Sequence, residues 1–359
     1  MTSTGRAPLL MAVDGNSLLH RAHHAHEHSG QRDTAGRPTW ALRGMVASIG
    51  GAAARLTPDA VVVGFDCSGD SCRKDDYPEY KAGRREKSPE LVDQLAGAPD
   101  LLRSAGFAVV QHDGWEADDV LASSAAMARV NGWRCTVVTS DRDSFALIDE
   151  TTSVLRVIVG GIDASPLLTP ARLPAVCGVA AGQYRDYAAV RGDTSDNLPG
   201  VLGIGAKTAA RLLAVFARVE DAYDALAGGR EDDVVAAIGP AATRRLADPL
   251  ARANVARNLR LMAMREDLEM PPLASTRVPM DVPRLHAGLR ERDILLGPSL
   301  WALTGGSPPG GDSWGWVADH EDLPPQGLPE PRRPEVVPAV AVAVVEVAQV
   351  EEQAQLSLF

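Results

Sequence analysis

Aromatic residues and cysteines are both scarce in this sequence. Aromatic residues make up 4% of its 359 residues, whereas hydrophobic residues make up 45%. Ala, Val and Leu must therefore fill most of the core. The four cysteines, Cys67, Cys72, Cys135 and Cys177, include no Cys-X-X-Cys pair, which argues against a zinc knuckle. We interpret them as reduced thiols of a cytoplasmic protein.

Long apolar runs are absent as well. No stretch reaches the roughly 18 apolar residues that a membrane span needs. The Val/Ala run at 336–350 is interrupted by Pro338 and Glu346. The run Leu9-Leu10-Met11-Ala12-Val13 is too short for the apolar part of a secretory signal. We therefore expect a cytoplasmic protein without a membrane partner.

Basic residues are outnumbered by acidic ones, and the formal net charge of −11 at first argues against nucleic-acid binding. The charge is unevenly placed, however. From Thr304 to the end there are nine acidic and two basic residues, which leaves 38 acidic and 34 basic residues in the rest. If nine of those 38 carboxylates hold metal ions, the remaining surface is net positive. A DNA substrate is therefore not excluded.

Short apolar runs alternate with helical patterns in the first half of the chain. Residues 9–13, 60–65, 107–111 and 135–139 have the pattern of buried strands, and residues 41–55, 90–105 and 117–130 that of helices. This alternation predicts an α/β fold with a parallel sheet. Functional residues of such sheets collect beyond the carboxyl ends of the strands. Asp14, Asp66 and Asp141 each stand at such an end.

The pattern changes near Ala180, where glycine-rich turns begin to separate helical stretches. We therefore predict a catalytic domain over residues 1–179 and an all-helical domain over residues 180–303. The composition of residues 304–350, rich in Pro, Gly and acidic residues, is typical of a disordered linker. Residues 351–359 form a short amphipathic end.

Acidic residues recur in five segments. Nine of them are candidate metal ligands: Asp14, Asp66, Glu116, Asp118, Asp119, Asp141, Asp143, Asp193 and Asp196. Hard cations such as Mg²⁺ prefer carboxylate oxygens, and two such ions support in-line attack on a phosphodiester. Each segment also has an ordinary interpretation, as a helix cap, a turn or a favourable charge at a helix N-terminus.

The segments Glu116-Ala117-Asp118-Asp119-Val120-Leu121-Ala122 and Gly192-Asp193-Thr194-Ser195-Asp196-Asn197-Leu198-Pro199-Gly200-Val201 resemble the 5′-nuclease family. That family comprises the flap endonucleases and the N-terminal 5′–3′ exonuclease domain of bacterial DNA polymerase I. The similarity spans about residues 8–303 and fills all nine acidic positions. It implies a PIN-like (Rossmann-like) nuclease domain followed by a helix–hairpin–helix (H3TH) domain, in a stand-alone 5′ nuclease.

The resemblance also implies roles for these acids. Six residues would serve mainly one Mg²⁺ or Mn²⁺ ion: Asp14, Asp66, Glu116, Asp118, Asp119 and Asp141. Asp143, Asp193 and Asp196 would serve mainly a second ion.

The stretch Tyr77-Pro78-Glu79-Tyr80-Lys81-Ala82-Gly83-Arg84-Arg85 matches the family's basic helix or arch. There Lys81 and Arg84 would contact the scissile phosphate, Arg73 would contribute nearby, and Tyr80 would contact DNA. A solvated basic face is the alternative. Two positions depart from the family, because Cys72 and His23 stand where aromatic residues are common.

Gly200-Val201-Leu202-Gly203-Ile204-Gly205 resembles the hairpin of the helix–hairpin–helix motif. Its glycines let the backbone approach DNA, and amide groups at the next helix N-terminus can bind phosphate without reading sequence. The predicted DNA-binding residues are Gly200, Val201, Gly203, Ile204, Gly205, Lys207 and Thr208. In the family this hairpin also holds K⁺. A plain glycine turn is the alternative.

Five histidines lie between His20 and His28. Such a run could bind zinc. The family resemblance instead places this helix near the 5′ end of the DNA, with Arg21 as a phosphate contact.

The last five residues, Gln355, Leu356, Ser357, Leu358 and Phe359, resemble the short peptide that binds the bacterial sliding clamp. Leu358 and Phe359 would fill an apolar pocket, and the linker before them would raise the local concentration.

Together these features predict a monomeric, structure-selective 5′–3′ exonuclease or 5′-flap endonuclease. Its substrates would be DNA with 5′ ends or flaps, including RNA–DNA primers. Two alternatives remain: a nuclease of the same broad fold acting on RNA, and a non-catalytic DNA-binding protein.

Overall fold

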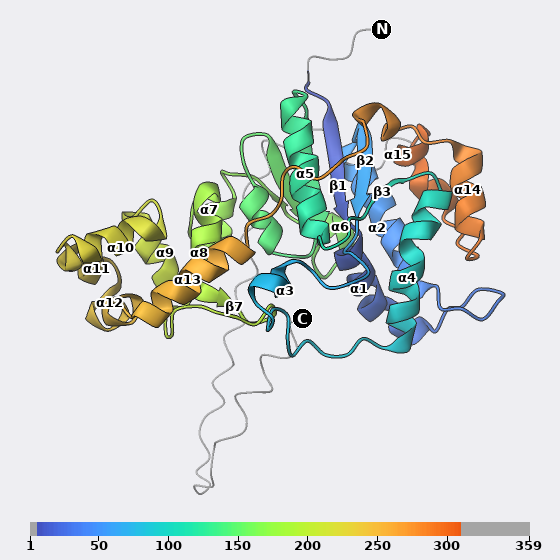
Figure 1. Ribbon diagram of the computed structural model, residues 1–359. Helices are drawn as coiled ribbons and strands as arrows, with labels where there is room; N and C mark the ends of the chain where they lie inside the picture. Colours follow the sequence, from blue (N-terminus) through green and yellow to red (C-terminus); the bar gives the residue numbers. More distant parts are fainter. Residues whose placement is uncertain (1–5, 310–359) are drawn as a thin grey trace, which may run out of the picture. The chain divides into compact units, whose positions relative to one another are not determined.

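The computed structural model describes residues 6–309 (Figure 1). Its six-stranded sheet has the order β3-β2-β1-β4-β5-β6. The strands are β1 (Leu9–Asp14), β2 (Ala60–Gly64), β3 (Ala108–Val110), β4 (Arg134–Thr139), β5 (Thr152–Arg156) and β6 (Leu167–Leu168). The first five are parallel to their neighbours, and only β6 runs antiparallel. The predicted α/β sheet is confirmed, with one antiparallel edge strand.

Helices cover both faces of this sheet (Figure 1). In the first half of the chain they are α1 (Gly15–His26), α2 (Trp40–Leu56), α3 (Arg73–Asp76), α4 (Pro89–Ser104), α5 (Ala117–Val130), α6 (Gly161–Ala164) and α7 (Leu173–Cys177). The side chains of β1 alternate between the faces. Leu10 and Ala12 join the core on the side of α5, while Met11 and Val13 join the core that contains α1 and α2.

A helical region follows. It contains α8 (Tyr184–Arg191), α9 (Ala206–Val215), α10 (Val219–Ala227), α11 (Glu231–Ile238), α12 (Pro240–Leu246) and α13 (Pro249–Leu261). Between α8 and α9, β7 (Gly192–Asp193) and β8 (Leu198–Pro199) pair as an antiparallel hairpin. The sequence pattern predicted no strand here, because two residues are too short to show an alternation.

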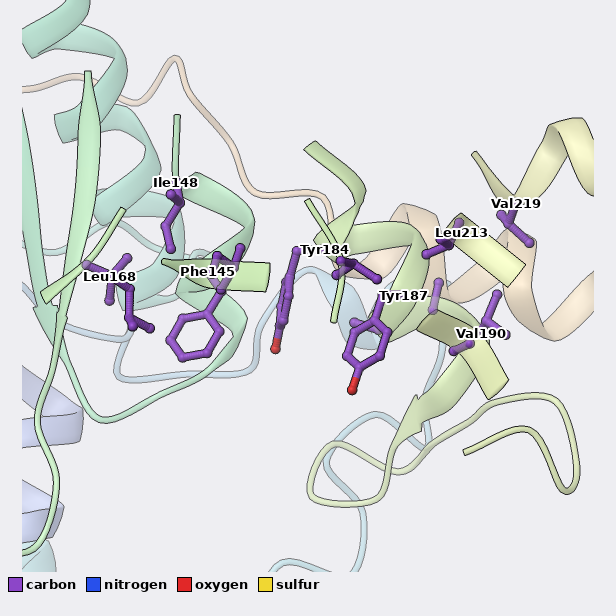
Figure 2. Packing of buried hydrophobic residues seen from close by; sticks show 14 of the residues in the cluster. Phe145, Ile148, Leu168, Tyr184, Tyr187, Val190, Leu213 and Val219 are labelled. Atoms are coloured by element: carbon purple, nitrogen blue, oxygen red, sulfur yellow. The ribbon is translucent and has the colours of Figure 1, made fainter. Parts of the chain in front are cut away.

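The core does not break at the predicted boundary near residue 180. Figure 2 shows one buried cluster that runs from Leu168 in β6 and the nearby Phe145 to Tyr184, Leu213 and Val219 in the helical region. The rings of Phe145 and Tyr184 lie 5.3 Å apart, centroid to centroid. Apolar contact of this kind couples the helical region to the sheet.

The last part of the predicted helical domain 180–303 packs on helices that cover the sheet. Residue 277 bridges back to Ala60 beside the sheet, and α14 (Val282–Arg290) and α15 (Trp301–Thr304) pack on α4 and α2 (Figure 1). Leu285 and Leu303 are buried in that core. Periodicity marks these segments as amphipathic helices, but it cannot say which apolar surface they cover.

No helix among residues 6–309 is long and apolar enough to cross a membrane. The predicted linker begins at Thr304, which is still the last residue of α15. Residues 310–350 of that linker and the predicted clamp-binding tail lie outside the described residues.

Candidate active site

Three acids stand at the carboxyl ends of adjacent parallel strands, as the sequence predicted. Asp14 ends β1 and caps α1, accepting a hydrogen bond from the Ser17 amide at 2.9 Å. Its other oxygen accepts from the Thr139 hydroxyl at 2.7 Å, at the end of β4. The same hydroxyl accepts from the Asp141 amide. Thr139 therefore ties the ends of β1 and β4 together.

Asp66 follows β2 and is fixed by its neighbours. Its oxygens accept from the Asn16 side chain and from the Ala117 amide, both at 2.9 Å. The amide of Ala117 belongs to the first turn of α5, where backbone amides have no carbonyl partner within the helix. Asp66 thus holds the start of α5 against the sheet edge.

The start of α5 contributes three acids with different surroundings. The Glu116 amide donates to the Asp119 side chain at 3.0 Å, and the Asp119 amide donates to the Glu116 carbonyl at 3.1 Å. Both oxygens of Asp119 are engaged, by Arg73 at 2.8 and 2.9 Å and by the amides of Glu116 and Arg265. Asp118 differs, because its buried Oδ1 has no hydrogen-bond partner. Asp118, not Asp119, therefore offers a free oxygen to a cation.

The remaining acids come from a 3₁₀ turn and from the β7–β8 hairpin. Asp143 begins the turn Asp143–Leu147, and its amide donates to Asp141 at 3.0 Å. Asp193 lies in β7 and accepts from the Ser195 amide. Asp196 accepts from the Tyr80 hydroxyl at 3.0 Å.

Glycine makes the hairpin that carries Asp193 and Asp196 possible. Gly192 has a φ of +80°, and a Cβ there would lie 2.3 Å from the Gly200 nitrogen. Any side chain at this position would push the two strands apart.

Mutual repulsion marks the acids as one cluster. Burial raises the pKa of Asp118 well above its usual range, and the neighbouring Asp141, Asp14 and Asp143 add to the rise. Asp143 is raised in the same way, by burial and then by Asp141, Asp193 and Asp196. Burial also raises the pKa of Asp14 to about 7, with smaller contributions from Asp66 and Asp141.

The donor set fits hard divalent cations. It consists of carboxylate oxygens, and it includes the buried, unpartnered oxygen of Asp118. Cations between the carboxylates would relieve the repulsion that raises their pKa values. Among residues 6–309, no three of these acids bring ligand atoms within 4.8 Å of one another.

The basic residues of the segment after α3 lie on these acids. Lys81 Nζ is 2.7 Å from Glu116 Oε1, and Arg84 pairs with Asp196. Although burial by itself lowers it, the pKa of Lys81 is raised by the carboxylates of Glu116 and Asp196. Residues 77–88 form turns and extended chain rather than the helix that the family pattern allowed.

Tyr80 does not face solvent, contrary to the expectation of a DNA contact. It is 4% exposed, its ring packs with Leu198 and Leu261, and its hydroxyl donates to Glu116 and Asp196. Its side chain therefore orients two acids of the cluster.

Arg73, which was expected to contribute near the scissile phosphate, is also buried. Besides Asp119, it lies 3.3 Å from Glu116 and donates to the carbonyl of Leu261 at the end of α13. Its guanidinium connects the acidic cluster to the helical region.

The hairpin Gly200–Gly205 presents backbone and small residues. Val201 and Ile204 are buried, and their amides donate to the carbonyls of Val190 and Val201. These two predicted DNA contacts therefore anchor the hairpin. Gly203, Gly205 and Lys207 are exposed, and Thr208 is half-buried in the first turn of α9. This exposed part is where the backbone could approach phosphate.

A pocket lies among the acids. Asp118, Asp143 and Asp196 line one part, and the apolar side chains of Leu198 and Leu261 line another.

Two arginines beside the cluster were not among the predicted site residues. Burial lowers the pKa of Arg156, and the positive charges of Arg142 and Arg21 lower it further. Arg156 Nε is buried without a hydrogen-bond partner. Arg156 ends β5, a strand that the sequence pattern did not reveal. Arg142 stands inside the motif Ser140-Asp141-Arg142-Asp143. That motif was the one sequence feature from which a basic residue near the acids could have been predicted.

Known proteins share these features. The chain matches the family models "5'-3' exonuclease, N-terminal resolvase-like domain" over residues 9–173 and "5'-3' exonuclease, C-terminal SAM fold" over residues 179–281. It is 35% identical to DNA polymerase I of Mycobacterium tuberculosis over 269 residues, which is 75% of this chain and 28% of the polymerase. It is 38% identical to the thermostable DNA polymerase I of Thermus aquaticus over 211 residues, 59% of this chain and 24% of that one. The chain thus spans less than a third of these relatives.

The fold is shared with solved structures. The 5′-exonuclease of bacteriophage T5, with zinc bound, superposes with a TM-score of 0.56 at 21% identity, covering 71% of this chain and 89% of the phage protein. The same score and identity hold for the phage T5 flap endonuclease in complex with DNA and metal ions, again over 71% of this chain.

Proposed function

The chain belongs to the 5′–3′ exonuclease family of nucleases, and we propose that it is a structure-selective 5′–3′ exonuclease and 5′-flap endonuclease acting on DNA. The observation that carries this proposal is the gathering of carboxylates at one sheet edge, with a buried, unpartnered oxygen on Asp118. The substrates are DNA with 5′ ends or flaps, including RNA–DNA primers.

We infer that two Mg²⁺ or Mn²⁺ ions act here. Asp14, Asp66, Glu116, Asp118 and Asp141 would hold one ion, and Asp143, Asp193 and Asp196 would hold the other. Bound there, such ions supply Lewis acidity and lower the pKa of water. The geometry leads us to assign Asp119 a different role, because both its oxygens are engaged. It holds Arg73 in place.

The chain's own residues supply charge and order. Lys81 and Arg84 now neutralise Glu116 and Asp196. With cations held by the carboxylates, Lys81 and Arg84 would be available to a phosphodiester and would stabilise its developing negative charge. Lys81 has a φ of +58° and its amide donates to the Asp196 carbonyl, so its backbone is fixed close to the reaction.

The hairpin region would hold the duplex away from the cut. Exposed Gly203 and Gly205 and the first turn of α9 can bind phosphate oxygens through the backbone. Lys207 and Thr208 add side-chain donors, and a K⁺ ion on hairpin carbonyls is part of the proposal. Arg21, with Arg142 and Arg156, would bind phosphate at the 5′ end.

The C-terminal peptide 355–359 is proposed to bind a bacterial sliding clamp. It is joined by the linker 304–350 and lies outside the described residues. Deleting residues 355–359 should abolish binding to purified clamp and leave cleavage of naked DNA unchanged. Unaltered clamp binding would refute this part. We further propose a monomeric, cytoplasmic protein.

The main test uses a 5′-labelled flap duplex. We expect cuts near the junction with Mg²⁺, none with chelator, and none by Asp143→Asn. Asp232→Asn on α11, an exposed acid far along the chain from the cluster, should cut at the wild-type rate. A flap duplex left intact with Mg²⁺ would contradict the proposal. So would equal cutting by Asp143→Asn.

A further inference from the structure

The end of α1 carries a second group of metal-ligand side chains, remote in chemistry from the acidic cluster. Among residues 6–309, His23, His24 and Glu27 are the one group of three or more such residues whose ligand atoms all lie within 4.8 Å of one another. The proposed nuclease function does not use these residues.

Their spacing follows from the helix. Positions three and four apart lie on neighbouring turns of the same face. Glu27 Oε2 is 3.9 Å from His23 Nε2 and 3.9 Å from His24 Nδ1. His28 Nε2 lies 4.0 Å from the other Glu27 oxygen and could supply a fourth ligand.

Only small movements separate this geometry from coordination. Ligands of tetrahedral zinc, bound at about 2.0–2.2 Å, stand roughly 3.3–3.4 Å from one another. The side chains of His24 and Glu27 are 66% and 44% exposed, so both can change rotamer freely. The side chain of His23 is 6% exposed and fixed.

His23 itself lacks the partners that a buried imidazole normally has. Its Nδ1 has no hydrogen-bond partner, and its Nε2 has one weak contact, 3.5 Å from the Ser88 hydroxyl. Nε2 is the nitrogen that faces Glu27, and no strong hydrogen bond occupies it.

We propose that His23, His24 and Glu27 form a binding site for one divalent transition-metal ion of the zinc class. Imidazole nitrogens with one carboxylate suit Zn²⁺, whereas the all-oxygen acidic cluster suits Mg²⁺. The site adjoins Ser88, which caps α4 directly after the basic segment 77–87. A bound ion would fix the end of α1 next to that segment.

The test is a calorimetric titration of the full chain with ZnCl₂ in excess Mg²⁺, which competes at the acidic cluster. Histidine-ring nitrogen NMR is followed in parallel. We expect one binding event that shifts the ring signals of His23 and His24. His24→Gln should weaken it at least tenfold, the scale seen when even outer ligand contacts are lost. His26→Gln is the matched control on the same helix, since His26 rests against Gly44 of α2.

Asp143→Asn separates the two sites, because it alters the acidic cluster and should leave this event unchanged. Unshifted His23 and His24 signals under Zn²⁺ would overturn the proposal. So would an equal loss of affinity in His24→Gln and His26→Gln, or loss of the event in Asp143→Asn.

Discussion

The guanidinium of Arg73 binds the carboxylate of Asp119 through two hydrogen bonds, of 2.8 and 2.9 Å, and both side chains are buried. The same guanidinium donates to the Leu261 carbonyl at the end of α13. One ion pair thus links the helix that carries Glu116 and Asp118 to the last helix of the helical region.

Removing Arg73 should lower the free energy of unfolding. Arg73→Ala leaves Asp119 charged and buried without its partner, which costs about 3–5 kcal/mol for such pairs. Urea unfolding followed by circular dichroism would measure this cost. Arg103→Ala breaks an exposed pair with Asp100 and should cost at most about 1 kcal/mol. Equal midpoints for the two variants would show that the buried pair does not hold the fold.

The metal-free protein should lose stability as the pH rises toward 7. Burial raises the pKa of Asp14 from 3.8 in the unfolded chain to about 7 in the fold. Between these values the folded state binds the extra proton, so its stability falls with increasing pH and the penalty is complete above about 7. Asp14→Asn removes this pH-dependent loss of stability, because the amide does not ionise.

Thermal unfolding in chelator between pH 4.5 and 8 would show it. The melting temperature of Asp14→Asn minus that of wild type should increase as the pH rises. Addition of Mg²⁺ at pH 8 should raise the melting temperature of wild type. A pH-independent difference between the two proteins would contradict the origin we assign to the shift.

Lys81→Ala should slow the chemical step without preventing DNA binding. Its ammonium group lies on Glu116, inside the cluster. Loss of one preorganised charge donor at a reacting phosphate costs on the order of 100- to 1,000-fold in rate. Single-turnover cleavage of a flap duplex would measure it. Lys74→Ala serves as a control, because Lys74 pairs with Asp70 on the exposed side of α3. Similar rates for the two variants would show that Lys81 does not contribute to the chemical step.

Arg156→Gln should weaken the binding of 5′-phosphorylated DNA. The group around Arg21, Arg142 and Arg156 concentrates positive charge beside Asp141. Each phosphate contact that is lost lowers the slope of log affinity against log salt by about one. Fluorescence anisotropy in chelator at several salt concentrations would reveal this. Arg103→Gln, on the exposed face of α4, should keep the wild-type slope. An unchanged slope for Arg156→Gln would exclude a phosphate contact.

The sequence by itself determined the first four strands of the sheet, their ends and the acids that stand there. Strand ends of a parallel sheet meet at one edge whatever the surrounding detail, so Asp14, Asp66 and Asp141 could be placed together from pattern alone. Short motifs likewise marked Asp118 and Asp193.

Only the tertiary structure decided how these acids divide their roles. The two neighbours Asp118 and Asp119 look equivalent in the motif, yet one has an unpartnered oxygen and the other is saturated by Arg73 and by backbone amides. The partner of Asp119 lies 46 residues away in the chain. Hydrogen bonds over such separations depend on packing, which local pattern does not encode. For the same reason, only the tertiary structure shows that α14 and α15 pack on α4 and α2 and that the Tyr80 hydroxyl donates to Glu116 and Asp196.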